Sequence, residues 1–198
     1  MDQAQERTIR EWTDALASSE PVPGGGGAGA LLGALSACLA SMVGNLTAEK
    51  RGYEDFWEDC RNLNGKAAAL QSRMLELIDE DAQAFRELMK AWKTTAADQD
   101  YAKACAPAQK TVFAVIEVLD ILRILREKGN RNVLSDVGIG ACCARAALEA
   151  SRINILVNLR CIRSPEFRKE LEAALETLIP EGIRQSEMIS KQVEKELR

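Results

Sequence analysis

The segment Pro21–Thr47 constrains the fold of this chain more than any other part of the sequence, because it is long, uncharged and rich in small residues. It opens with four consecutive glycines, Gly24–Gly27, and continues as an Ala/Leu/Gly run long enough for a helix of about five turns. A helix with so little side-chain bulk lets neighbouring backbones approach closely. Its glycine-rich start leaves backbone N–H groups uncovered at the positive end of the helix dipole, which favours an anion or a polar ligand edge.

A membrane span is the alternative interpretation of this segment, since roughly 20 apolar residues cross a bilayer. The run, however, is richer in Ala and Gly than in Leu and Ile, and it contains Ser36, Ser41 and Asn45. No aromatic residue lies at either end, where a membrane interface would favour one. We therefore expect a buried helix of an all-helical protein and no membrane partner.

Composition excludes several functional classes. The chain has 26 basic and 30 acidic residues and a net charge of −4, which argues against nucleic acid as its main partner. It contains no histidine, so Ser-His-Asp and Cys-His catalysis are excluded and a catalytic zinc site is not expected. The six cysteines show no metal-ligand spacing and no signal peptide precedes them, which indicates reduced thiols in a cytoplasmic protein and no bound metal.

Apolar periodicity predicts one all-α domain over residues 1–198, a bundle of long helices with two small-residue-rich core helices. Within Val112–Leu125 almost every residue is apolar, so this helix should lie at the centre of the bundle or at a subunit interface. The two small-residue helices should pack on each other or on their counterparts in a second subunit. The expected helices cover about residues 2–18, 24–48, 53–92, 101–128 and 165–198, the last with a break at Pro180, and a further helix opens within residues 130–136.

Local signals place the ends of these helices. Gly129 is expected just beyond a helix end, and Asn132 or Ser135 is expected to cap the helix that follows. Pro107 indicates a kink or a delayed helix start. Asn154 and Asn158 lie one helical turn apart, where they could line a polar cavity or form ordinary interhelical hydrogen bonds.

Asp81 is the candidate catalytic residue. Apolar positions step by four and three from Leu63 to Leu77 and resume in the same register from Phe85 to Trp92, and this register places Asp81 on the core stripe. A carboxylate there should be partly desolvated, which raises its pKa unless a partner compensates. A structural hydrogen-bond anchor is the alternative role. Asp79 and Glu80 lie off the stripe and should be solvated.

Three ordered blocks carry a resemblance to a known family. They are PVPGGGGAGALLGALSACLASMVGNLT at 21–47, IDEDAQAF at 78–85, and GNRNVLSDVGIGACCARAALEASRINILVNL at 129–159. Together they resemble the formiminotransferase-cyclodeaminase C-terminal domain family, in its order and spacing, from about Ile9 to Phe167. The resemblance implies an all-α homodimer acting on a tetrahydrofolate one-carbon derivative, with no further cofactor. Its members are methenyltetrahydrofolate cyclohydrolases and formiminotetrahydrofolate cyclodeaminases.

The resemblance also implies site residues. The acid of the family's DxDAxAF block falls on Asp81, and the glycine motif on Gly24, Gly25 and Gly26. The Ser/Asp pair of its NxxxSD block falls on Ser135 and Asp136.

Residues around these motifs could bind the rest of a folate. Its anionic glutamate tail, or another polar edge, could be held by Lys50, by Arg51 or by the uncovered N–H groups near Gly24–Gly26. Asn132 with Asp136 could hydrogen-bond its pterin ring. Lys50 and Arg51 could equally be solvated turn charges, and Asn132 and Asp136 could equally serve as helix caps.

Three departures from the family pattern are visible. This chain has Gly27 in place of a usual Ser, Glu49 in place of the Gly of a usual Gly-Lys pair, and a short connection over 94–101. The competing functional class is therefore a non-catalytic helical dimer that binds a folate or a protein partner.

Overall fold

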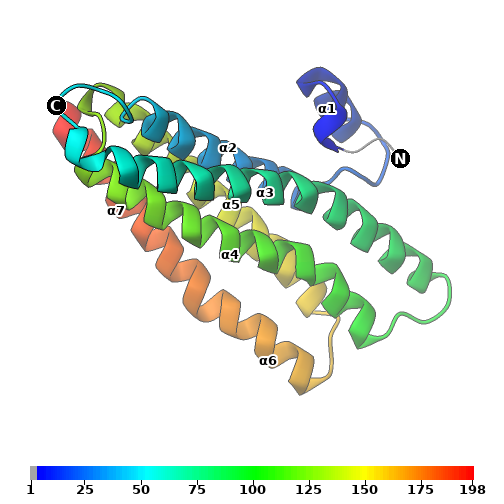
Figure 1. The fold of residues 1–198 in the computed structure, drawn as a ribbon. Helices are drawn as coiled ribbons and strands as arrows, with labels where there is room; N and C mark the ends of the chain where they lie inside the picture. Colours follow the sequence, from blue (N-terminus) through cyan, green and yellow to red (C-terminus); the bar gives the residue numbers. More distant parts are fainter. Residues whose placement is uncertain (1–3) are drawn as a thin grey trace.

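The structure, a computed structural model, describes residues 4–198 apart from the side chains of residues 170 and 174. Long helices dominate it, which confirms the predicted all-α fold. Figure 1 shows them running side by side as an elongated bundle, with the short α1 set apart near the N-terminus. The α-helices are α1 (Ile9–Leu16), α2 (Gly25–Asn45), α3 (Trp57–Trp92), α4 (Asp98–Lys128), α5 (Leu134–Leu159), α6 (Pro165–Ala173) and α7 (Ile179–Leu197).

Small residues let α2 lie in close contact with its neighbours, as predicted. Gly29 packs against Ala150 of α5, and the Ser36 hydroxyl donates to the Gly140 carbonyl at 2.8 Å. A side chain at Gly33 would overlap with Met74 of α3. Helix α2 is long and apolar enough to cross a membrane by length and composition, but half of that window is buried inside the bundle. The two small-residue helices therefore pack on each other within one chain.

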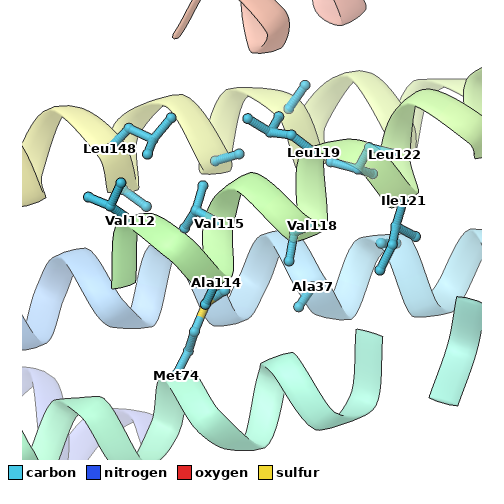
Figure 2. Close-up of a cluster of buried hydrophobic side chains, with 14 of the residues drawn as sticks. Ala37, Met74, Val112, Ala114, Val115, Val118, Leu119, Ile121, Leu122 and Leu148 are labelled. Atoms are coloured by element: carbon cyan, nitrogen blue, oxygen red, sulfur yellow. The ribbon is translucent and has the colours of Figure 1, made fainter. Parts of the chain in front are cut away.

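Helix α4 lies at the centre of the bundle, packed against α2, α3, α5 and α7. Val115, Leu119 and Leu122 are fully buried, and Figure 2 shows side chains of α4 between α2, α3 and α5. The polar strip of this helix, with Glu117 and Asp120, is exposed. Of the two positions predicted for this helix, the centre of the bundle is confirmed.

We expect Leu122→Ala to destabilise the fold by about 2–5 kcal/mol, because deleting a fully buried leucine removes apolar contacts and leaves a cavity. Phe113→Ala on the same helix is the matched control, since the Phe113 side chain is 54% exposed. Urea unfolding of both variants measures the difference. Equal losses of stability would contradict the assignment of α4 as the central helix.

The structure corrects several predicted boundaries. The first helix begins at Ile9, where the Thr8 side chain and Glu11 form a capping box, and a short 3-10 turn at Ala4–Glu6 precedes it; residues 2 and 3 of the prediction lie outside the described part. Helix α4 begins at Asp98, so the delayed start assigned to Pro107 is wrong.

The cap before α5 also differs from the prediction. Asn130, rather than Asn132 or Ser135, is the capping residue: its Oδ1 accepts from the Asn132 N–H at 3.0 Å in the short 3-10 helix Arg131–Val133. Gly129 is the C-cap of α4 in an extended conformation. The end of the apolar stripe of α3 lies outside the core, because Trp92 is 50% exposed and stacks edge-to-face on Phe85.

The C-terminal helices flank α4 and α5. Helices α6 and α7 are joined by a π-helical turn, Ala174–Leu178, and Pro180 lies in the first turn of α7, close to the predicted break. Ile179, Ile189 and Val193 of α7 are buried, whereas its charged residues lie on its outer side. The amphipathic α7 therefore covers one side of the bundle.

Candidate functional site

Asp81 lies where α3 meets the start of α2. Its Oδ2 accepts a hydrogen bond from the Gly27 backbone N–H, and its Oδ1 accepts one from the Asn154 side-chain amide of α5, each at 3.1 Å. Three helices thus converge on a single carboxylate. The apolar register of α3 turns Asp81 inward, because Leu77 and Ile78 beside it are buried.

The glycines of α2 are what allow this approach. A Cβ atom built on Gly26 would overlap with Asp81 Oδ1 and Asn154 Nδ2, whereas one built on Gly25 would meet nothing within 4 Å. Gly24 caps the helix without any side-chain hydrogen bond. Within residues 4–198, no hydrogen-bond partner is found for the N–H groups of Gly25 and Gly26, which point outward at the positive end of the α2 dipole.

Burial raises the pKa of Asp81, and this desolvation is the largest effect on the group. The hydrogen bonds from Asn154 and Gly27 lower the pKa and offset part of the shift. The carboxylate is therefore held in place by donors that favour its ionised form, in surroundings that disfavour charge. Such a group attracts a cation and exchanges a proton more readily than a solvated carboxylate.

The neighbouring acids differ from the sequence expectation, which left both solvated. Asp79 accepts two hydrogen bonds from the Ala4 backbone N–H, at 3.0 and 3.1 Å, and so ties the N-terminal segment to α3. Glu80 forms ion pairs with Arg73 and Lys110, and the Arg73 hydrogen bond is the main reason that the pKa of Glu80 is lowered. Both acids are thus structural contacts of α3 and lie apart from the Asp81 hydrogen bonds.

A cavity of about 510 Å³ lies between the N-terminal segment and α3. Trp12, Pro23 and Ile78 form apolar walls, and Arg86 lines its polar side. Ile78 and Trp12 are also the side chains nearest to Gly27, so one wall of the cavity adjoins the start of α2. Its volume is typical of a small-molecule site.

A second polar cluster lies at the far end of α2. Asn130 is buried; its side-chain amide donates to the Leu46 carbonyl and its Oδ1 accepts from Lys50 Nζ at 2.9 Å. The Asn132 N–H donates to the same oxygen. Because α2 has 21 residues, roughly 30 Å separates this cluster from the glycine start of the helix.

The predicted site residues thus fall into two groups within one chain. The structure brings Asp81 together with Gly24–Gly26. It places the other candidates at the opposite end of α2, namely Lys50, Arg51, Asn132, Ser135 and Asp136. In this second group Arg51 and Ser135 are exposed and Asp136 is half-buried.

Three residues of these clusters, Gly27, Asn154 and Asn130, were not among the predicted site residues. The sequence identifies Asn154 only as one of two asparagines, with Asn158, that could line a polar cavity. Nothing in the sequence shows that Asn154 faces Asp81. Asn130 is buried by contacts with Thr47 and Leu46, a tertiary effect that no local pattern predicts. Among the described residues, no group of three or more His, Cys, Asp or Glu side chains could hold a metal ion.

Comparison with known proteins confirms the fold and identifies the family. The formiminotransferase-cyclodeaminase family model matches residues 8–177. This chain belongs to the formiminotransferase-cyclodeaminase family. The resemblance seen in the three sequence blocks is thereby confirmed. Each block contributes to the cluster: the glycines come from 21–47, Asp81 from 78–85 and Asn154 from 129–159.

Two kinds of relative share this family. The chain is 35% identical to a methenyltetrahydrofolate cyclohydrolase of Methylorubrum extorquens over 90% of this chain and 92% of that protein. It is 26% identical to the formimidoyltransferase-cyclodeaminase of Rattus norvegicus, but it spans only 36% of that longer protein. The crystal structure of a formiminotetrahydrofolate cyclodeaminase from Thermotoga maritima matches with a TM-score of 0.89 and 27% identity, covering 96% of this chain and 98% of that one.

Proposed function

We propose that this protein is a tetrahydrofolate one-carbon enzyme and that its reaction is the hydrolysis of a methenyltetrahydrofolate. The observation that carries the proposal is the desolvated Asp81 carboxylate, hydrogen-bonded by Gly27 and Asn154 at the uncovered start of α2. The methenyl group is a cation, and a buried carboxylate stabilises positive charge more strongly than a solvated one. The 35% identity to a cyclohydrolase over nearly its full length supports this choice.

The proposed hydrolysis uses one carboxylate for two proton transfers. The oxygen of a water molecule bonds to the methenyl carbon, and Asp81 takes one proton of that water. The bond between this carbon and one folate nitrogen then breaks, and Asp81 returns the proton to that nitrogen. The remaining hydroxyl proton leaves to solvent as the carbonyl forms, so one water is consumed and one proton is released.

Cyclodeamination is the second candidate, favoured by the close match to the Thermotoga maritima cyclodeaminase structure. Here a folate N–H nitrogen would attack the carbon of the formimino group, whose own nitrogen is protonated. Asp81 would carry the proton from that nitrogen to the departing amino group, which leaves as ammonia. The product is the methenyl cation, so both reactions place the same positive carbon beside the same carboxylate.

The rest of the proposal concerns binding and assembly. The cavity beside the α2 start, which has both apolar and charged walls, is large enough for part of a folate. We further propose a cytoplasmic homodimer that needs no additional cofactor and binds no metal, nucleic acid or membrane. The residues proposed to bind the substrate are Gly24, Gly25, Gly26, Lys50, Arg51, Asn132, Ser135 and Asp136.

A paired assay tests the proposed function. Purified protein is given methenyltetrahydrofolate while loss of the methenyl absorbance is followed, and formiminotetrahydrofolate while ammonia release is followed. We expect turnover of the methenyl compound. Ammonia release alone would assign the protein as a cyclodeaminase, and folate binding without either reaction would favour the non-catalytic helical dimer.

Thermal stability should depend on pH through Asp81. Because burial raises the pKa of Asp81, ionising this side chain lowers the free energy of unfolding. This loss of stability is absent below the unfolded-state pKa. It is complete once the pH exceeds the raised folded-state pKa. We therefore expect Asp81→Asn to raise the Tm relative to wild type at pH 7, with a smaller difference at pH 4. Calorimetry at both pH values measures this, and a lower Tm for the variant at pH 7 would contradict it.

A further inference from the structure

Two arginines that line the cavity between the N-terminal segment and α3 lack a partner in the described part of the chain. Arg86 lies on α3 and is half-buried, whereas Arg7 belongs to the N-terminal segment and is exposed. Neither guanidinium group forms an ion pair or donates a hydrogen bond within residues 4–198. Partial burial removes water from a guanidinium group, and a bound anion compensates for that loss.

The acids that line the same cavity, by contrast, are all paired. Glu76 and Glu80 both form ion pairs with Arg73, and Glu80 also pairs with Lys110. Asp79 accepts hydrogen bonds from a backbone N–H of the N-terminal segment. Among the described side chains, the two arginines are therefore the charges of the cavity wall that remain unpaired.

The apolar wall of the cavity lies against the start of α2. Trp12, Pro23 and Ile78 each come within 4 Å of the position that a Cβ atom would take on Gly27. The indole N–H of Trp12 is buried and has no acceptor among residues 4–198, and an unpaired buried donor is rare in proteins. The arginines and this indole thus offer N–H donors for which the described chain supplies no acceptor.

The apolar wall and Arg86 lie along the same side of α3. Ile78 and Arg86 are eight positions apart, which corresponds to about 12 Å along the helix axis. The Ile78 end adjoins the Asp81 cluster, because Ile78 lies beside the same Gly27 whose N–H donates to Asp81. A ligand that extends from Asp81 along the cavity thus meets apolar side chains first and guanidinium groups second.

We infer that this cavity binds the benzoyl-glutamate part of a folate, with the aromatic ring against Trp12 and the glutamate carboxylates on Arg86 and Arg7. This inference rests on the proposed function, and it places the glutamate tail here rather than at Lys50 or Arg51. Guanidinium groups bind carboxylates through paired N–H donors, which suits the charged end of the ligand. Aromatic rings pack favourably on one another, which suits the apolar end.

The chemical order of a folate matches the order of groups along the cavity. The benzoyl ring joins the nitrogen that carries the one-carbon unit to the glutamate, as the apolar wall joins Asp81 to Arg86. The pterin ring suits the cavity less well, because its amino and ring N–H groups would face N–H donors that already lack acceptors. The volume of about 510 Å³ accommodates a ligand segment of this size.

Equilibrium binding tests this assignment without turnover. Calorimetric titration compares tetrahydrofolate with its diamide, in which both glutamate carboxylates are replaced by neutral carboxamides. We expect Arg86→Met and Arg7→Met to raise the Kd for tetrahydrofolate, by about 10-fold for the half-buried Arg86 and by less for the exposed Arg7, because each removes a charged hydrogen-bonded pair. Neither substitution should change the Kd for the diamide.

Lys103→Met, at an exposed position of α4, is the matched control and should change neither Kd. Circular dichroism checks that each variant is folded. If Arg86→Met is unfolded, Arg86→Lys decides instead: it keeps the charge but loses the paired N–H groups, so it should raise the Kd for tetrahydrofolate and leave that for the diamide unchanged. Wild type that binds both ligands equally well, arginine variants with an unchanged Kd for tetrahydrofolate, or equal weakening of both ligands would overturn the inference.

Steady-state rates separate this binding role from a structural one. With methenyltetrahydrofolate, Arg86→Met should raise KM and leave kcat close to that of wild type, because the carboxylate contact is the same before and during the reaction. A fall in kcat at unchanged KM would contradict the assignment. If wild type turns over neither folate, the proposed function fails, whereas the titrations with tetrahydrofolate and its diamide still decide whether the cavity binds the glutamate carboxylates.

Discussion

The Asp81→Asn variant is expected to lose at least about 100-fold of wild-type kcat with the preferred folate, because it removes both the proton carrier and the negative charge beside the cation. The amide is close to isosteric with the carboxyl group. It can still accept from the Gly27 N–H and, once the Asn154 amide flips, donate to its oxygen, so the fold should be retained. Steady-state rates from the methenyl absorbance or from ammonia release measure the loss.

Asp79→Asn is the control for this substitution, since Asp79 lies two residues away and contacts the N-terminal segment rather than the Asp81 cluster. Its kcat should stay close to that of wild type, and any change should appear in KM, because Asp79 lines the cavity beside α3. If Asp81→Asn retained most of its turnover as well, Asp81 would play no part in the chemistry and its burial would be purely structural.

Gly26→Ala is expected to reduce kcat/KM by about 100-fold or more, because misplacing a reacting group by about 1 Å is sufficient for such a loss. The added methyl would overlap with Asp81 Oδ1 and Asn154 Nδ2, so the carboxylate must move or the start of α2 must shift. Either change breaks the hydrogen bond from Gly27. Rates for the variant and its circular dichroism spectrum separate a misplaced acid from a lost fold.

Two other glycines supply comparisons for that result. Gly65→Ala adds the same methyl on the exposed side of α3, where nothing lies within 4 Å, and should leave turnover unchanged. Gly25→Ala meets open space and leaves Asp81 in place, so it should raise KM through the glycine N–H groups proposed to bind the substrate and leave kcat largely unchanged. A fall in kcat for Gly25→Ala equal to that for Gly26→Ala would contradict the close approach of Asp81 to the α2 start.

Much of the architecture could be predicted because it depends on local periodicity. The length of α3 and the inward direction of Asp81 follow from the spacing of Leu63, Leu77 and their neighbours along one stripe. The pairing of α2 with α5 follows from small residues, since only such helices can approach as closely as Gly29 and Ala150 do. These features are set by residues a few positions apart in sequence.

The remainder depends on contacts between distant segments. The cap before α5 was assigned to Asn132 or Ser135 because both fit a local pattern, but Asn130 is the residue buried against Thr47 and Leu46. The same limit applies to the site. No local pattern shows that Asn154 faces Asp81, or that Lys50 lies at the other end of α2.

The most direct test of the central claim, that the partly buried Asp81 carboxylate is the ionising group of the reaction, is the pH dependence of kcat/KM in Asn154→Leu compared with wild type. In wild type the rate should fall as pH drops through the raised pKa of Asp81. Asn154→Leu removes an amide that lowers this pKa and keeps the space filled, so the acidic fall should move to higher pH.

Asn158→Leu, one turn away, alters a residue that donates to the Asn154 carbonyl and has no hydrogen bond to Asp81 among the described residues, so it should leave the profile in place. We predict a shifted profile for Asn154→Leu alone. An acidic fall at the same pH in all three proteins would show that another group controls the reaction and would contradict the account.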